Sequence, residues 1–399
     1  MQFILNKIFK KQERQLKQSI SENIELEDFE LTFLQQENNS KNIIYSPLSI
    51  KYILKMLSDG AEGSTKVQID NIIKNQKYIK YSTIPDILSF ANSIYINKKY
   101  SDQINNNYNI LLNEKYNAEI KFDELDSADN INNWVKDKTF GIIKKVLEDR
   151  EISADTSLIV INALAINMAW QDKFRTSHTH GEGFYLEDGN VMVATMMNKT
   201  LHYENSSYYQ DNNVIAVSLD LEEYNNTQLE FIAIMPQTGY KEFIKKFTID
   251  SLKTITAKLQ APITKEYDVE LTIPKFSYDY ELQLTNDLQR IGMHDAFDKE
   301  KANFSKMISP EAIYPIYINK IKHKANIEFS EEGIKAAAVT AAIAMFSGVP
   351  FEERKIIELK LNKPFIYFIR DKKNEEIWFV GTVGKPNSWD EDRKKYKNR

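Results

Sequence analysis

The chain has 399 residues, 42% of them hydrophobic, so it is long enough to bury a large core. Its net charge of -5, from 52 basic and 57 acidic residues, gives it no bulk attraction for nucleic acid or for an anionic membrane. It contains no cysteine, which excludes disulfides, thiolate metal sites and a thiol nucleophile, and permits a reducing compartment.

Residues 1–22 form a basic extension. The apolar run Phe3, Ile4 and Leu5 ends before Lys7, and it is too short for a signal peptide or a membrane span. We therefore expect a cytoplasmic protein, with leaderless secretion as the other route. A basic amphipathic helix over residues 1–21 is the feature that would touch a membrane, but its apolar face is short, so a solvated extension is favoured.

The first half of the chain predicts mainly helices. Residues 24–35 have apolar side chains at helical spacing. Ser46 and Pro47 then have the residue types of an N-cap and a first helical turn, and this helix should end at Asp59 and Gly60. Further helices are predicted from Ser64 or Thr65 to residue 73, over 108–112 and over 128–146.

The second half predicts mainly strands. Residues 158–168 are almost continuously apolar around Asn162, which is typical of a strand that is covered on both faces. A strand should also open at Ile94 and Tyr95. Other strands are predicted over 214–221, 229–235, 269–276, 356–361, 364–370 and 377–383. The sequence predicts one α+β domain over residues 23–388, followed by a charged tail over 389–399.

The stretch EEGIKAAAVTAAIAMFSGVP, residues 331–350, is unlike an ordinary core or loop. Its small and β-branched residues, with no proline before Pro350, could enter a sheet as a strand at little steric cost. Alternation with period two puts one set of mostly small residues on a common face: Ile334, Ala336, Ala338, Thr340 and Ala342.

The chain resembles the serpins from about residue 24 to residue 387. The motifs that carry the resemblance follow one another in family order: NIIYSPLSIKYILKMLSDGAEG at 42–63, NNWV at 132–135 with TFGII at 139–143, INALAINMAW at 161–170, KF at 173–174, VATMM at 193–197, IPKF at 273–276, GM at 292–293 with DAF at 295–297, HKA at 323–325, and PF at 364–365 through FVG at 379–381. Each motif is weak alone, and their order makes the match specific.

The resemblance implies three β-sheets, about eight or nine helices and a metastable native state. Residues 331–355 would be an exposed reactive-centre loop that a protease cleaves, after which the freed segment inserts into the main sheet and traps the enzyme covalently. The hinge residues carried over are Glu331, Glu332, Gly333, Ile334, Ala336, Ala337, Ala338 and Thr340. Ile334 departs from the threonine or serine usual in the family, and it would slow insertion.

Two further sites carry over from the resemblance. Ser46, Ser49, Asn162 and His323 match a polar cluster, called the shutter, under the centre of the main sheet where its strands part. Trp170, Lys275 and Glu331 match the breach, the top of that sheet where insertion begins, with a salt bridge between Lys275 and Glu331.

The family's spacing from Glu331 puts the scissile bond between Ser347 and Gly348. Ser347 would suit a protease with an elastase-like pocket. A shift of one residue puts Phe346 in the pocket and implies a chymotrypsin-like or cathepsin G-like target, and Phe346 beside Ser347 also suits papain-like cysteine proteases. A non-inhibitory carrier, chaperone or storage protein is the competing class, which Ile334 supports.

We expect no enzyme activity, cofactor or metal site. The chain has no His-Glu-x-x-His, Gly-x-Ser-x-Gly or phosphate-loop motif, and His178 and His180 have no third ligand nearby in the sequence. The segment 65–91 is much shorter than in the familiar vertebrate members of the family. Its lysines, Lys74, Lys77 and Lys80, are typical of a solvated face, so we expect no glycosaminoglycan requirement. The partner would be the target protease, with no nucleic acid and no membrane, and the protein would be a monomer.

Overall fold

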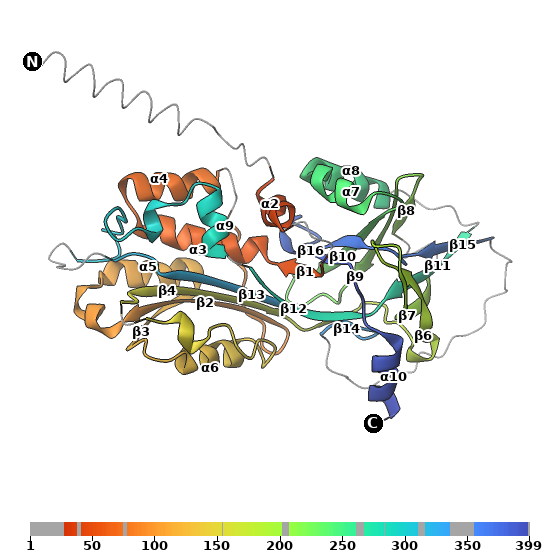
Figure 1. Ribbon diagram of the computed structural model, residues 1–399, viewed down its shortest axis with the longest axis horizontal. Helices are drawn as coiled ribbons and strands as arrows, with labels where there is room; N and C mark the ends of the chain where they lie inside the picture. Colours follow the sequence, from red (N-terminus) through yellow and green to blue (C-terminus); the bar gives the residue numbers. More distant parts are fainter. Residues whose placement is uncertain are drawn as a thin grey trace, which may run out of the picture.

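Figure 1 shows a computed structural model of the chain, which describes residues 28–37, 41–74, 78–153, 155–201, 207–260, 267–282, 284–309, 316–335 and 355–397. In these residues nine α-helices and seventeen strands form sheets of seven, six and four strands. The predicted α+β architecture with three sheets is therefore confirmed.

The seven-stranded sheet is the long horizontal sheet of Figure 1. Its strands are β2 (Leu88–Asn97), β3 (Ala118–Asp123), β4 (Leu158–Ile166), β5 (Met168–Ala169), β12 (Phe276–Leu282), β13 (Lys320–Phe329) and β14 (Gly333–Ile334). Helix α6 (Asp129–Lys138) lies on one face, and α3 (Pro47–Gly60) and α9 (Leu284–Arg290) lie on the other. Because both faces are covered, β2 and β4 are buried along their whole length.

The six-stranded sheet stands beside the α3 face and supplies much of the aromatic core. Its strands, in spatial order, are β1 (Ile43–Tyr45), β17 (Ile377–Val383), β16 (Phe365–Asp371), β10 (Leu229–Pro236), β9 (Val214–Asp220) and β8 (Tyr208–Gln210). Three helices lie near it in Figure 1: α2 (Phe29–Gln36), α7 (Tyr240–Lys246) and α8 (Ile249–Leu259).

The four-stranded sheet occupies one end of the molecule, in the order β15 (Lys355–Lys360), β11 (Tyr267–Pro274), β7 (Val191–Leu201) and β6 (Thr179–Tyr185). The predicted tail includes helix α10 (Trp389–Lys397), which packs against β7. The remaining α-helices are α4 (Gly63–Ile72) and α5 (Asn106–Tyr116).

Local sequence signals place several of these elements correctly. Ser46 caps α3, since its Oγ accepts a hydrogen bond from the Ser49 N–H at 3.0 Å, and Pro47 is the first helical residue. The strand expected to open at Ile94 instead begins at Leu88, because Leu88 to Ala91 pair with Ile166 to Ala163 of β4. Between residues 78 and 87 the structure describes no helix, in line with the short segment predicted there.

The segment predicted as one strand over 269–276 is two strands in different sheets. Strand β11 ends at Pro274, and β12 begins at Phe276. Lys275 is the single residue between them, so it lies where the chain passes from the four-stranded to the seven-stranded sheet.

Candidate functional site

The candidate site is the line along which β4 and β13 meet in the seven-stranded sheet, which we call the seam. The two strands pair directly and in parallel from Lys320 opposite Ile159 to His323 opposite Asn162. At the far end of β13 the two-residue strand β14 separates it from β5, the continuation of β4. The seam is thus closed in its lower part and occupied by another strand in its upper part.

Strand β14 is held between two neighbours. Ile334 lies opposite Phe329 on one side and Met168 on the other, while Gly333 lies opposite Ala169. Ile334 is only 3% exposed, so its side chain is in the core. Burial of a large aliphatic side chain stabilises this position by about 2 kcal/mol.

Gly333 is required at its position. Its φ is +154°, and a Cβ built there would lie 2.2 Å from the carbonyl oxygen of Met168. A side chain would therefore collide with the neighbouring backbone, which cannot move aside cheaply. The glycine assigned to the hinge thus lets β14 approach β5.

A narrow void of about 10 Å³ lies next to β14. Ile334 and Lys335 border it from above the seam, Ile166 and Ile327 from the flanking strands, and Phe379 from the six-stranded sheet. The void is at the small end of what one water molecule needs, and its lining is mainly hydrophobic.

At the top of the seam, Glu331 is 4% exposed and its carboxylate contacts Lys275 and Thr179, a set of three residues that we call the latch. Lys275 Nζ lies 2.7 Å from Oε2, and Thr179 Oγ1 donates to Oε1 at 2.9 Å. The pair predicted between Lys275 and Glu331 is therefore present, and the partner that the sequence did not indicate is Thr179. A charge buried in this way needs such partners, and removing one of them is costly.

Trp170 donates two hydrogen bonds to backbone carbonyls beside the latch. Its indole Nε1 donates to the Ser330 carbonyl at 2.8 Å, and its own N–H donates to the Glu332 carbonyl at 3.0 Å. Glu332 also pairs with Lys173 at 2.8 Å, where both side chains are partly exposed. The turn before β14 is thus held by Trp170 and Lys173, which directly follow β5 in the chain.

The polar cluster predicted from Ser46, Ser49, Asn162 and His323 lies at the upper limit of the direct pairing. His323 Nε2 accepts a hydrogen bond from the Ser46 N–H at 3.0 Å, and His323 stands opposite Asn162 in the sheet. Asn162 in turn donates to Asn92 Oδ1 at 2.5 Å. Asn92 is the member that the sequence did not reveal, since its position opposite Asn162 depends on the strand register.

The cluster is incompletely bonded. Ser49 Oγ, Asn162 Oδ1 and His323 Nδ1 are buried and have no hydrogen-bond partner among the described residues. Burial lowers the pKa of His323 to about 4, so the ring is neutral at neutral pH and Nε2 can accept its bond.

Below the cluster, an ion-pair network crosses the same strands. Lys322 of β13 is buried and pairs with Glu281 of β12 and with Glu151, which lies 3.1 Å away in the link between α6 and β4. Lys320 also reaches Glu151, at 2.9 Å. Burial raises the pKa of Glu151, but hydrogen bonds from the Glu148 N–H and the two lysines outweigh it and lower the pKa to about 2.

The structure corrects one expectation about the loop predicted over 331–355. Glu331, Gly333 and Ile334 are buried at the top of the sheet rather than exposed, because Ile334 and the Glu331 carboxylate both find partners there. Lys355 already belongs to β15. The other residues assigned to the hinge and the reactive bond lie outside the described residues: Ala336, Ala337, Ala338, Thr340, Phe346, Ser347 and Gly348.

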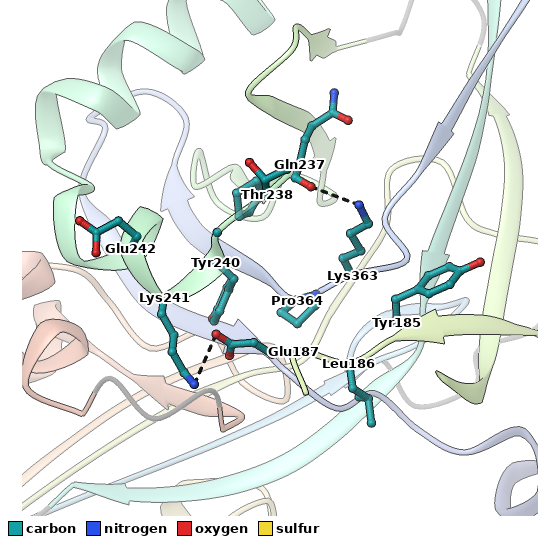
Figure 2. A pocket seen from close by; sticks show the side chains of 12 residues that line it. Tyr185, Leu186, Glu187, Gln237, Thr238, Tyr240, Lys241, Glu242, Lys363 and Pro364 are labelled. Atoms are coloured by element: carbon teal, nitrogen blue, oxygen red, sulfur yellow. Dashed lines mark hydrogen bonds and ion pairs between the residues drawn. The ribbon is translucent and has the colours of Figure 1, made fainter. Parts of the chain in front are cut away.

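A separate cavity of about 510 Å³ lies between the β6–β7 turn, the start of α7 and the start of β16. Figure 2 shows Lys241 directed toward Glu187, at 3.6 Å, and Lys363 donating to the Gln237 carbonyl at 3.1 Å. The free oxygen of Glu187, Oε2, is enclosed by protein. With Glu242 the cavity has two acidic and two basic side chains, so it favours no ligand of either charge.

The described part of the chain has no group of three histidine, aspartate or glutamate residues placed to hold a metal ion. In that part, no helix is long and apolar enough to cross a membrane.

The described residues thus form three sheets in an α+β fold, and the largest sheet accommodates Gly333 and Ile334 between β13 and β5. The family model described as "Serpin (serine protease inhibitor)" matches residues 27–386. The chain therefore belongs to the serpin family.

Relatives and solved structures agree with this assignment. An uncharacterized serpin-like protein of Methanosarcina acetivorans is 30% identical over 370 residues, covering 88% of this chain and 82% of that protein. The human leukocyte elastase inhibitor is 28% identical, covering 88% of this chain and 95% of that protein. The native structure of tengpin, a thermophilic serpin, is similar with a TM-score of 0.74 and 29% identity, over 90% of this chain and 92% of that one.

Proposed function

We propose that this protein inhibits proteases as a suicide substrate. The target cleaves the segment between β14 and β15, and the freed strand enters the seam while the acyl-enzyme is still intact, which traps the protease as a covalent complex. The observation that carries this proposal is β14 itself, a two-residue strand that already occupies the upper seam at the start of the cleavable segment.

The residues after β14 support insertion. Ala336, Ala338 and Thr340 continue the inward face that Ile334 begins, and all three are small. Ile334 is already seated, so its size does not have to pass into the sheet during inhibition. Ile334, where the family usually has threonine or serine, then acts before cleavage by holding the hinge in the sheet.

Specificity follows from the residues near the expected bond. Ser347 before Gly348 suits a serine protease with an elastase-like pocket, and Phe346 suits a chymotrypsin-like or cathepsin G-like one. The similarity to the leukocyte elastase inhibitor supports the first choice. Papain-like cysteine proteases remain the cross-class alternative.

The test is to mix the purified protein with pancreatic elastase, chymotrypsin and papain in turn and to look for a complex that survives SDS. We expect such a complex with at least one serine protease, together with a released carboxyl-terminal fragment whose first residue identifies the bond. Complete cleavage without any complex would contradict inhibition and would favour a non-inhibitory carrier, chaperone or storage role.

Two matched variants separate insertion from simple cleavage. Ala338→Arg puts a charge on the inward face, and Ala337→Arg puts the same charge on the opposite face. We expect Ala338→Arg to turn the inhibitor into a substrate, whereas Ala337→Arg continues to form the complex. Equal behaviour of the two variants would overturn the insertion mechanism.

A further inference from the structure

The segment from Asn387 onward lies beyond the part of the chain that the family model matches. It nevertheless makes a dense set of hydrogen bonds beside the latch. Asn387 uses all of its polar groups: its N–H donates to the Lys275 carbonyl at 2.9 Å, its carbonyl accepts from the Thr195 N–H at 3.0 Å, and its side-chain Oδ1 accepts from the Ser277 N–H at 3.0 Å. Its Nδ2 donates to Asp392 Oδ2 at 3.2 Å.

Asp392 completes this arrangement from α10. It is 4% exposed, and its Oδ2 also accepts a hydrogen bond from Thr195 Oγ1 at 3.0 Å. The indole of Trp389 packs so closely on Gly181 of β6 that a Cβ there would lie 2.6 Å from the ring. Helix α10 is therefore fixed to β6 and β7 at two points one turn apart.

These contacts converge on the backbone of Lys275, the residue whose ammonium group holds Glu331. The Lys275 N–H donates to the Thr195 carbonyl at 2.8 Å, and the Lys275 carbonyl accepts from Asn387. The N–H and the carbonyl of Lys275 are thus held by Thr195 and Asn387, and both of these residues bond to Asp392 of α10. A shift of this backbone would move the ammonium group away from the carboxylate that it neutralises.

We propose that Asn387 and Asp392 are positioning residues for the hinge: they hold Lys275 in place and so keep the latch closed until the loop is cleaved. This inference rests on the proposed inhibitory function and adds a control on its timing. We call Asn387 and Asp392 together the brace. Without the brace, the latch would open more readily and the uncleaved loop would insert spontaneously, which gives an inactive protein.

The experiment compares Asp392→Ala with Asp390→Ala, a substitution of the same kind at an exposed position of the same helix. Each full-length variant is incubated at a temperature at which the wild type slowly becomes resistant to urea, and the rate of that conversion is measured. We expect Asp392→Ala, which loses the hydrogen bonds from Thr195 Oγ1 and Asn387 Nδ2, to convert at least about tenfold faster, and Asp390→Ala to match the wild type. The conservative Asp392→Asn, which keeps an acceptor oxygen, should stay close to the wild type.

Thermal unfolding of the loop-cleaved proteins separates this role from general stabilisation. If the brace acts through the latch, cleaved Asp392→Ala unfolds at nearly the same temperature as cleaved wild type. Equal conversion rates for the alanine variant and the wild type, or an equal loss of stability before and after cleavage, would overturn the proposal. Should Asp392→Ala be insoluble, Thr195→Val removes one of these two hydrogen bonds from its other end and is expected to convert faster than the wild type.

The same series tells the two proposals apart. If wild type never converts and gains no stability on cleavage, the inhibitory function fails. If wild type converts but Asp392→Ala does so at the same rate, only the role of the brace fails.

Discussion

The lower and upper parts of the seam join the same two strands in different ways. In the lower part, β4 and β13 pair directly and the ion pairs of Lys322 hold the link after α6 against β13. In the upper part, β14 lies between β13 and β5, and the latch around Glu331 fixes the turn that leads into β14. The difference is that a short strand lies within the sheet at one end, whereas direct strand pairing closes the other end.

The largest expected effect comes from filling the space at Gly333. Gly333→Ala puts a methyl group against the Met168 carbonyl, so β14 should leave the sheet and the native state should lose more than about 3 kcal/mol. Urea unfolding measures the loss, and hydrogen exchange of the Lys335 amide, which donates to Glu328, reports release of the strand. The control is Gly292→Ala, where φ is +105° but the surroundings are open. An equal cost in both variants would show that φ rather than the upper seam is responsible.

The next effect concerns pH in the lower seam. His323 has a native pKa of about 4, below its ordinary value of 6.5, so the unfolded chain binds more protons between these limits. The stabilisation from the neutral ring is complete above about pH 6.5 and is lost as the pH falls toward 4, by about 3 kcal/mol in total. Unfolding free energies measured from pH 7 to 4 should show this loss relative to His323→Gln.

Asp287 changes the free energy of unfolding with the opposite sign over part of that pH range. Burial, with a smaller contribution from Glu37, raises its pKa to about 6 against the opposing effect of Arg290, so its native state favours protonation as the pH falls. The comparison with His323→Gln cancels this contribution because both proteins contain Asp287. Identical pH profiles for the two proteins would contradict the assigned role of His323.

A smaller effect is expected from the ion pairs below the cluster. Glu151→Gln removes the partner that Lys320 and Lys322 share and leaves Lys322 with Glu281 alone, which should cost about 2 kcal/mol. It should also speed spontaneous insertion, since the link after α6 is released from β13. Glu124→Gln, which removes an exposed pair with Lys98, is the control and should change stability by less than about 0.5 kcal/mol. A similar result for both variants would mean that the network does not close the lower seam.

The smallest effect tests packing in the upper seam. Ile334→Val removes one buried methylene and should cost about 1 kcal/mol in urea unfolding. The same change at Ile356, which is 58% exposed, should have almost no effect. If both changes are neutral, Ile334 does not stabilise the seated hinge.

The sequence predicted the parts of the site that depend on residue type and order. The cap at Ser46, the buried strand around Asn162 and the pair between Lys275 and Glu331 all appear in the structure. Asn92 and Thr179 were missed because they meet their partners only through strand register. The seating of Ile334 was missed because whether a residue is in or beside a sheet depends on the space between two distant strands, which no local pattern encodes.

The most direct test of strand insertion is the thermal unfolding temperature before and after a single cleavage between residues 336 and 354. If the freed segment enters the seam, it adds backbone hydrogen bonds and buried side chains along its whole length, and the cleaved protein should unfold roughly 20 °C higher than the native one. An unchanged or lower unfolding temperature after clean cleavage would contradict the account.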